Sequence, residues 1–194
     1  MSRALRRASI PIWFTQGFNP HPYIFFALPL SLGFESECEF MDLRLEEDMS
    51  FEDVKTKLAK QMPEGVEIMD IYEPSTKITE IGFSQYIISL EYVKADQNEL
   101  NKIIDALRQL PNIIISKKTK TATREIDIKE YFISAKIEVS GSSLVISAIL
   151  PSGIHETINP ICFSEAIEKY CGINPQFESI IRRNVLNTDK QIFN

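Results

Sequence analysis

The residues best placed to do chemistry gather in one stretch near the start of the chain. Asn19-Pro20-His21-Pro22 sets a histidine between two prolines. A residue that precedes a proline is pushed out of the helical region, and each proline fixes its own φ angle. We therefore expect His21 in extended backbone with its ring thrown to one side, where it could act as a proton donor, a ligand or a phosphate contact. A rigid turn whose imidazole bonds to the backbone is an equally simple interpretation.

Basic and aromatic side chains lie close to this stretch. Arg3, Arg6 and Arg7 precede it, and residues 1–34 contain no acidic residue. Arginines beside aromatic rings can hold a polyanion with stacked bases, so RNA is a candidate ligand. Arginines on a terminal helix and asparagines in turns are also common as plain surface and turn residues. The candidate residues for binding a substrate or partner are Arg3, Arg6, Arg7, Gln16, Phe18, Asn19 and His21, and His21 alone is a candidate for catalysis.

Composition narrows the possible functions. The chain has 194 residues, of which 44% are hydrophobic, and a formal net charge of -6. It can therefore bury a core as one domain or as two small ones. The charge argues against strong nucleic-acid binding over the whole surface. Because residues 35–80 hold 14 acidic and 5 basic residues, we expect a polyanion to meet the N-terminal face instead.

Cysteine spacing and hydropathy indicate the compartment. Cys38, Cys162 and Cys171 are odd in number and are not spaced as a ligand set. We therefore predict reduced thiols and neither a metal nor another cofactor on this chain. No apolar run reaches the roughly 18 residues of a membrane span, and the start lacks a signal peptide's apolar stretch. A cytoplasmic location without a membrane partner follows as a prediction.

Periodicity predicts helices and strands in both halves of the chain. The first half should contain a helix over residues 2–9, strands over 10–15, 23–30, 34–45 and 66–72, and a helix from 50 to 63. The alternation over 34–45 changes phase at Phe40-Met41, which predicts a β-bulge or another irregular step in the strand. The second half should contain strands over 85–92, 113–116, 133–139, 144–150 and 177–186, with helices over 96–110 and 159–171.

This order of elements predicts an α+β fold of two tandem ferredoxin-like halves with antiparallel sheets. We place the halves at residues 1–76, which carry the proline-rich motif, and 77–194. The first half lacks the opening strand of that plan. Because the opening strand lies centrally, we expect the first sheet to close by another route, such as pairing with a second copy of the chain, or the native chain to start upstream of Met1.

The motif itself resembles a known family. Gln-Gly-Phe-Asn-Pro-His-Pro at residues 16–22, preceded by Arg-Ala-Leu-Arg-Arg-Ala at 3–8, is similar to the radical SAM-linked protein family of unknown function. The resemblance implies a radical SAM partner that binds cobalamin and carries the iron–sulfur cluster and S-adenosylmethionine. Relative to that family the chain is N-terminally truncated, because it begins inside the Arg-Ala-Leu helix. It also has Arg182-Arg183 where a histidine before an arginine is expected.

Three functions remain open at this point. The preferred one is an accessory domain, without catalytic activity of its own, that binds or presents RNA for the radical SAM partner. The second is a stand-alone RNA-processing enzyme that uses His21 on a double ferredoxin-like scaffold, by analogy of fold. The third is a structural module for protein docking. The first is preferred because the sequence has no second histidine at motif spacing, no phosphate-binding loop and no metal-ligand set.

Overall fold

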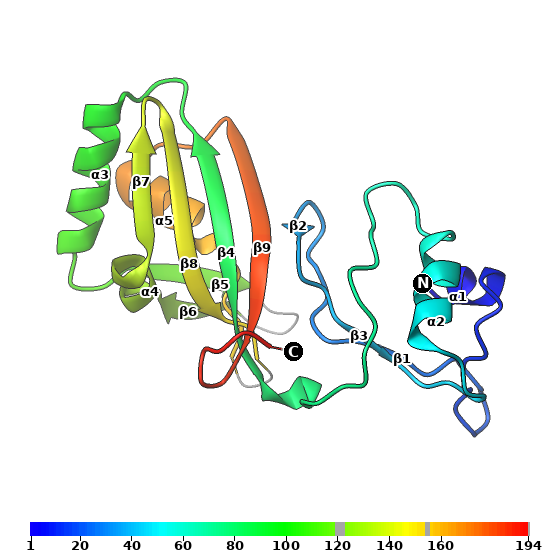
Figure 1. Ribbon diagram of the computed structural model, residues 1–194. Helices are drawn as coiled ribbons and strands as arrows, with labels where there is room; N and C mark the ends of the chain where they lie inside the picture. Colours follow the sequence, from blue (N-terminus) through cyan, green and yellow to red (C-terminus); the bar gives the residue numbers. More distant parts are fainter. Residues whose placement is uncertain (119–122, 154–155, 194) are drawn as a thin grey trace. The chain divides into compact units, whose positions relative to one another are not determined.

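The computed structural model describes residues 1–118, 123–153 and 156–193, and these form two compact units (Figure 1). The first unit consists of residues 1–29 and 39–77, and the second of residues 30–38 and 78–193. The passage from Lys77 to Ile78 lies beside the boundary set from the sequence. Residues 30–38, however, belong to the second unit although both of their flanks belong to the first. The units are therefore interleaved along the chain.

The second unit is built on a five-stranded sheet in the order β2-β9-β4-β8-β7 (Figure 1). The strands are β2 (Glu35–Ser36), β4 (Ile81–Glu91), β7 (Lys136–Ser140), β8 (Ser143–Pro151) and β9 (Phe177–Asn187). β2 runs parallel to β9, whereas β9, β4, β8 and β7 pair with their neighbours in antiparallel register. The sheet is thus mixed, and the prediction of a purely antiparallel sheet was wrong.

Helices α3 (Gln97–Gln109) and α5 (Cys162–Cys171) pack on one face of this sheet. α3 begins with a capping box: the backbone N–H of Glu99 donates to the Asp96 carboxylate at 2.9 Å, and that of Asp96 donates to the Glu99 carboxylate at 3.1 Å. Such reciprocal bonds satisfy backbone donors that a helix start leaves free. α5 ends at Gly172, whose φ of 73° needs the freedom of glycine. Both helix boundaries follow the sequence prediction.

The core of the second unit lies between these helices and the sheet. Along β8 the side chains of Leu144, Ile146 and Ala148 are buried, whereas those of Val145 and Ile149 are 37% and 40% exposed. This alternation is the period of two expected of a strand with one covered face. In the described part of the chain, Figure 1 shows no helix of this unit on the opposite face.

Smaller elements complete the second unit. They are η1 (Ile78–Glu80), the antiparallel pair of β5 (Ile114–Lys118) and β6 (Thr123–Asp127), and α4 (Lys129–Ser134). The sequence predicted neither β6 nor α4. The strand expected from residue 133 begins only at Lys136, because Ile133 lies in α4 with its side chain 56% exposed.

The first unit combines two helices with a two-stranded sheet. Its elements are α1 (Ser2–Arg7), β1 (Ile24–Phe26), β3 (Met41–Leu43) and α2 (Phe51–Ala59). β1 and β3 are antiparallel, and the isolated bridge Ile12–Leu45 extends this pairing. α2 starts as predicted, with the Ser50 hydroxyl accepting from the backbone N–H of Asp53 at 3.1 Å.

Three strands predicted for the first unit are shorter or absent. Residues 10–15 form only isolated bridges, and the strand over 23–30 is reduced to β1. Residues 66–72 form no strand. There Ile68 and Ile71 pack against the core from irregular backbone. Because they are three residues apart, they would point to opposite faces of a strand, so a strand could not bury both on one side.

The strand pairing is interrupted near Phe40-Met41, as predicted, and the interruption is a break between two sheets instead of a β-bulge. β2 ends at Ser36 beside β9, and β3 starts at Met41 beside β1. Residues 37–40 carry the chain from one unit to the other. The change of phase in the sequence therefore reflects two separate strands.

Helices with antiparallel and mixed sheets make this an α+β protein, as predicted. The tandem ferredoxin-like arrangement is not confirmed, because the sheet of the first unit has two strands. Among the described residues, no helix has both the length and the apolar character needed to cross a membrane.

Candidate functional site

A hairpin in the first unit holds the proline-rich motif. The backbone N–H of Thr15 donates to the carbonyl of His21 at 2.9 Å, and the N–H of Tyr23 donates to the carbonyl of Trp13 at 2.9 Å. Gly17 lies in the tip of the hairpin with a φ of 146°, which residues with a side chain rarely adopt. Backbone hydrogen bonds between its two arms therefore close the hairpin that holds the motif.

His21 is tied to this hairpin through one ring nitrogen. Its Nδ1 lies 3.0 Å from the Thr15 hydroxyl oxygen and 3.2 Å from the carbonyl oxygen of Asn19. The backbone N–H of His21 also donates to the Thr15 hydroxyl at 3.1 Å. The side chain is exposed. The imidazole therefore hydrogen-bonds to the backbone, as expected for a rigid turn. It is also exposed to solvent, as a residue that contacts a ligand must be.

The remaining tip residues point outward. Phe18 is fully exposed, with a relative accessibility of 101%, and Gln16 and Asn19 are exposed beside it. The side chains of Gln16 and Asn19 form no hydrogen bond with another described residue. These predicted binding residues are brought together by the hairpin, and their side chains do not contribute to the core.

Next to the hairpin, three aromatic side chains and one arginine form what we call the aromatic surface: Trp13, Tyr23, Phe25 and Arg44. The Trp13 and Tyr23 rings meet edge to face with their centroids 5.8 Å apart, and the Arg44 guanidinium lies 4.6 Å from the Trp13 centroid. Phe25 follows Tyr23 by two residues, so it shares that strand face, and it is 55% exposed. Sequence reasoning missed Arg44. The alternation of Asp42 and Arg44 with apolar residues was the signal that could have found it.

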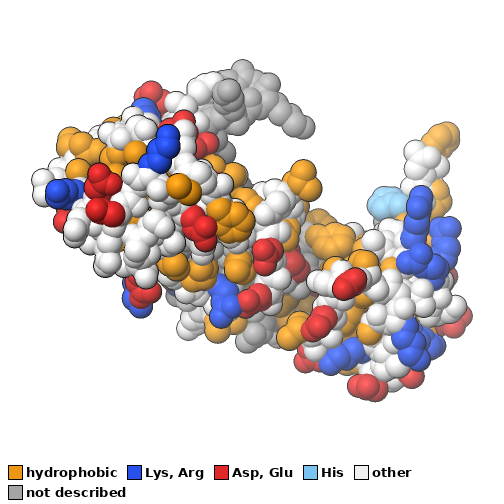
Figure 2. All heavy atoms as spheres, turned by 90° about the horizontal axis from the view of Figure 1, so that it is seen from above, with side chains coloured by type: hydrophobic (Ala, Val, Ile, Leu, Met, Phe, Trp, Pro, Cys, Tyr) orange, Lys and Arg blue, Asp and Glu red, His pale blue; other side chains and the backbone are white. Residues whose placement is uncertain are grey.

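The three arginines of α1 stand on the solvent side of a helix that buries Ala4 and Leu5. Among the described residues, Arg3, Arg6 and Arg7 form no ion pair. The described part of the chain shows no hydrogen bond or ring contact between these arginines and the hairpin. Figure 2 shows Lys and Arg side chains gathering on the surface around the pale-blue histidine. The first unit therefore carries cations that no described carboxylate neutralises.

Acidic residues limit this positive charge. Residues 39–77 hold 11 acidic and 5 basic residues. Asp42 pairs with Phe25 in the β1–β3 ladder, and burial raises the pKa of the Asp42 carboxyl. The aromatic surface is therefore acidic where Phe25 lies beside Asp42, and a polyanion would have to approach it from a side without carboxylates.

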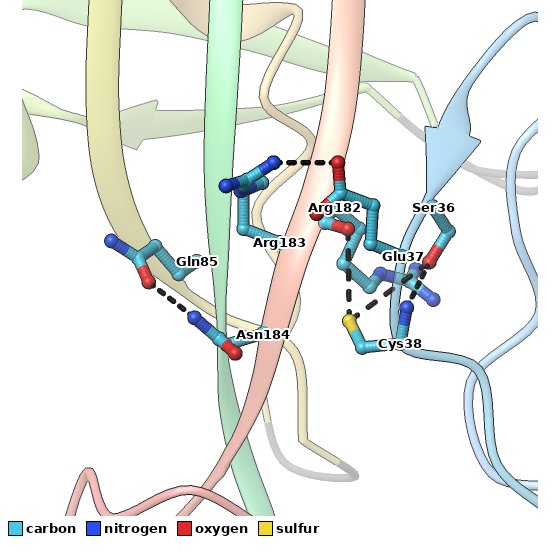
Figure 3. Close-up of polar contacts among 7 residues, drawn as sticks. All are labelled: Ser36, Glu37, Cys38, Gln85, Arg182, Arg183 and Asn184. Carbon is cyan, nitrogen blue, oxygen red and sulfur yellow. Dashed lines mark hydrogen bonds and ion pairs between the residues drawn. The ribbon is translucent and has the colours of Figure 1, made fainter. Parts of the chain in front are cut away.

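Arg182 and Arg183, which stand where a histidine was expected, belong to the second unit (Figure 3). Arg183 Nη1 pairs with Glu37 Oε1 at 2.5 Å, and both side chains are about half exposed. Arg182 is buried, with its guanidinium 5.8 Å from the Tyr86 ring centroid. Its carbonyl accepts from the Cys38 thiol at 3.6 Å. These contacts fasten residues 30–38 to β9, which is a structural role.

The cysteines show no sign of shared chemistry. No disulfide joins the cysteines of the described chain; Cys162 is buried in α5, and burial raises the pKa of its thiol. Within the ranges that the structure describes, no three His, Cys, Asp or Glu side chains are grouped so that they could hold a metal ion. The sequence also holds a basic stretch over residues 117–124, which lies partly outside the described residues, and His155, which lies wholly outside them.

Comparison with known proteins gives the family. Residues 1–160 match the profile of a family described as "Uncharacterized protein conserved in bacteria (DUF2344)". No curated protein and no solved structure matches the chain significantly. The family match covers most of the chain and includes the whole first unit with its hairpin. The chain therefore belongs to the DUF2344 family of conserved bacterial proteins.

Proposed function

We propose that the chain is an accessory module that binds single-stranded RNA and presents it to a cobalamin-binding radical SAM partner. The observation that carries the RNA part is the aromatic surface, with Arg44 stacked on Trp13. The partner is proposed from the resemblance of the Gln16–Pro22 motif. In this proposal the cofactors and the reaction belong to the partner.

The aromatic surface suits unpaired bases. Each base has a π face, and stacking on an aromatic side chain is worth about 1–3 kcal/mol per base without much sequence preference. Tyr23 and Phe25 are 46% and 55% exposed, so their rings are open to a ligand. The Arg44 guanidinium is planar and can stack on a base as it stacks on Trp13.

In this proposal the arginines of α1 bind the phosphates of the RNA. Arg3, Arg6 and Arg7 are exposed and have no ion-pair partner among the described residues. Neutralising phosphates releases condensed counterions, so binding through them should weaken with salt. The acidic residues of 39–77 repel the backbone and thereby restrict its path over the unit.

We also infer that the second unit follows the ferredoxin-like plan. Its support is the strand order β9-β4-β8-β7 with antiparallel neighbours, where α3 follows β4 and α5 joins β8 to β9. β5, β6 and α4 are then an insertion before β7, and β2 is an added edge strand. The corresponding plan for the first unit, without its opening strand, stays a prediction.

The stacking contact can be tested through the intrinsic fluorescence of the protein. Trp13 is the only tryptophan, so a stacked base reports directly on its emission. We expect a 12-nucleotide single-stranded RNA of mixed sequence to quench it. Phe25→Ala should weaken binding by about 5- to 150-fold, the equivalent of one base stack. Phe177→Ala is the matched control, because Phe177 is also 55% exposed but lies on β9 of the second unit.

The arginines can be tested by salt dependence. Each phosphate that a cation neutralises on a single strand contributes about 0.7 to the slope of log K against log salt. Replacing Arg3, Arg6 and Arg7 together by Ala should therefore reduce that slope by up to about 2. The matched control replaces Lys94, Lys102 and Arg108, which are exposed on the second unit. No RNA binding at low salt, or an unchanged slope in the triple variant, contradicts the proposal.

Protein docking is the second candidate, because the same surface has the composition of a protein interface. Trp, Tyr, Phe and Arg are the residues enriched at interface centres. A radical SAM protein of the same genome, purified without oxygen, should be titrated into the chain while Trp13 emission is followed. A response to the protein and none to RNA would favour docking, and Phe25→Ala should abolish that response.

A further inference from the structure

The contacts of His21 determine which ring nitrogen carries the proton. A carbonyl oxygen only accepts hydrogen bonds, and the Asn19 carbonyl lies 3.2 Å from Nδ1. If Nδ1 carried a lone pair instead, two acceptors would face each other at that distance. In the neutral ring the proton therefore belongs on Nδ1, which donates to Asn19 O and to the Thr15 hydroxyl at 3.0 Å.

The hairpin also fixes the direction in which the ring points. The Thr15 hydroxyl accepts from the backbone N–H of His21 at 3.1 Å, so one oxygen holds both the backbone and the ring of the same residue. Thr15 N–H donates to the His21 carbonyl from the opposite arm. Pro20 and Pro22 restrict the backbone on either side. Little freedom is left to the imidazole.

The second nitrogen, Nε2, is then an acceptor that faces solvent. The side chain is exposed, and no described residue hydrogen-bonds to Nε2. We infer that His21 Nε2 is a preoriented acceptor that reads a hydrogen-bond donor of bound RNA, either a ribose 2′-hydroxyl or a base amino or imino group. This inference rests on the RNA binding proposed above and assigns the contact that His21 makes.

The same geometry argues against one role suggested by the sequence. Phosphate oxygens are acceptors, and the lone pair of a neutral Nε2 repels them. A phosphate contact by the neutral ring would require the proton on Nε2, which removes the bond to Asn19 O. Phosphates are therefore assigned to the arginines, and His21 is assigned to a group with an N–H or O–H. Thr15 is a positioning residue, because it acts only through His21.

The protonation state can be read without RNA. The chain has two histidines, so His155→Gln leaves His21 as the single imidazole in a long-range 1H–15N spectrum. At pH 8.5 we expect the neutral ring with its proton on Nδ1. Thr15→Val removes the hydroxyl that holds the ring against Asn19 O, so the ring can turn away and both tautomers should appear; Thr15→Ser should restore the single form. A neutral ring with its proton on Nε2 would overturn the inference.

Binding supplies the second test, again at pH 8.5. His21→Phe, which keeps a ring but no acceptor, should weaken RNA binding by about two- to tenfold, as expected for one hydrogen bond. Oligonucleotides of the same sequence with 2′-deoxy or 2′-O-methyl riboses identify the donor. If the 2′-hydroxyl is the donor, the wild type loses the same factor with deoxyribose, and His21→Phe loses nothing further. If a base is the donor, the loss depends on base identity and persists with deoxyribose.

The outcomes separate the two proposals. If the wild type quenches Trp13 with RNA but His21→Phe binds equally well, the role of His21 is wrong and RNA binding stands. If the wild type binds no RNA, both fail. Thr15→Val should weaken binding as His21→Phe does, and Thr15→Ser should recover it; a purely structural loss of the hairpin would instead change Trp13 emission before any RNA is added.

Discussion

The two units place their apolar side chains differently. Among the described residues, twenty-three buried side chains form the core of the second unit, whereas seven form that of the first. The first unit in turn leaves Phe14, Tyr23, Phe25 and Phe26 between 43% and 55% exposed. Buried apolar area stabilises a fold by about 25 cal/mol per Å². The second unit thus uses such residues for stability, and the first keeps them accessible.

The difference suggests how stability is distributed along the chain. Segments that bury few apolar side chains open more readily than core strands, and binding surfaces are often drawn from them. Residues of the first unit should therefore exchange their amide protons earlier than β4 or β8. The following substitutions test this division of roles, from the largest expected effect to the smallest.

Phe163→Ala should have the largest effect. Phe163 is completely buried and its ring lies 5.7 Å from that of Phe132. Removing a buried phenyl group costs about 3–5 kcal/mol, because the neighbours close the cavity only in part. Urea unfolding followed by circular dichroism measures this loss. Phe177→Ala, at an exposed position of the same unit, should stay within about 0.5 kcal/mol.

Leu58→Ala tests the smaller core. Leu58 is 1% exposed in α2, and its truncation should cost about 2–3 kcal/mol, near the lower end for such a change because a small core can collapse around the gap. Hydrogen exchange should show faster exchange in residues 1–29 and 39–77 and unchanged protection in β4. Equal loss of protection in β4 would mean that the two units unfold as one.

The helix caps allow a matched comparison. Ser50→Ala in the first unit and Asp96→Ala in the second each remove a side-chain acceptor for a backbone N–H, at a cost of about 1 kcal/mol. Ser50→Thr and Asp96→Asn keep an acceptor and should recover most of it. The loss from Ser50→Ala should appear only in first-unit amides, and a loss spread over both units would break the comparison.

The smallest effect concerns pH. Burial, and then the neighbouring carboxylates of Glu178 and Glu168, raise the pKa of the Glu165 carboxyl. The folded protein then binds this proton more tightly than the unfolded chain, so the stability contributed by Glu165 falls as pH rises through the carboxyl range. Glu165→Gln should stabilise the protein slightly at pH 7 and not at all at low pH. A gain that is independent of pH would contradict this cause.

Elements with local signals were predictable from sequence. The helix predicted over residues 96–110 begins at Asp96, which with Glu99 forms the capping box of α3, and Gly141 lies between the predicted strands 133–139 and 144–150, which form the β7–β8 hairpin. In both cases the residues that determine the element lie within a few positions of one another in the sequence. The Asn19-to-Pro22 run likewise indicated a rigid turn, because proline acts on its own backbone and on the preceding residue.

Elements that depend on distant partners were not predictable. β2 is two residues long and exists because β9 lies beside it. The aromatic surface depends on Arg44 reaching Trp13 across the ribbon. The alternation over residues 41–46 indicates the strand face on which Arg44 lies, but not that Trp13 lies opposite it. The expected strand over residues 66–72 is absent because Ile68 and Ile71, three residues apart, both pack against the core, which a strand could not allow.

The parallel pairing of β2 with β9 has a consequence for biosynthesis. Ser36 cannot form its strand pairing until its partner in the ladder, Arg182, has been synthesised. At about 5–20 residues per second, the ribosome needs roughly 7–30 s to make the intervening chain. The residues of the first unit on both sides of β2 are complete long before that, so nascent protein spends this interval with residues 30–38 lacking their strand partner. A chaperone that engages the first unit early would therefore meet residues 30–38 before they pair with β9.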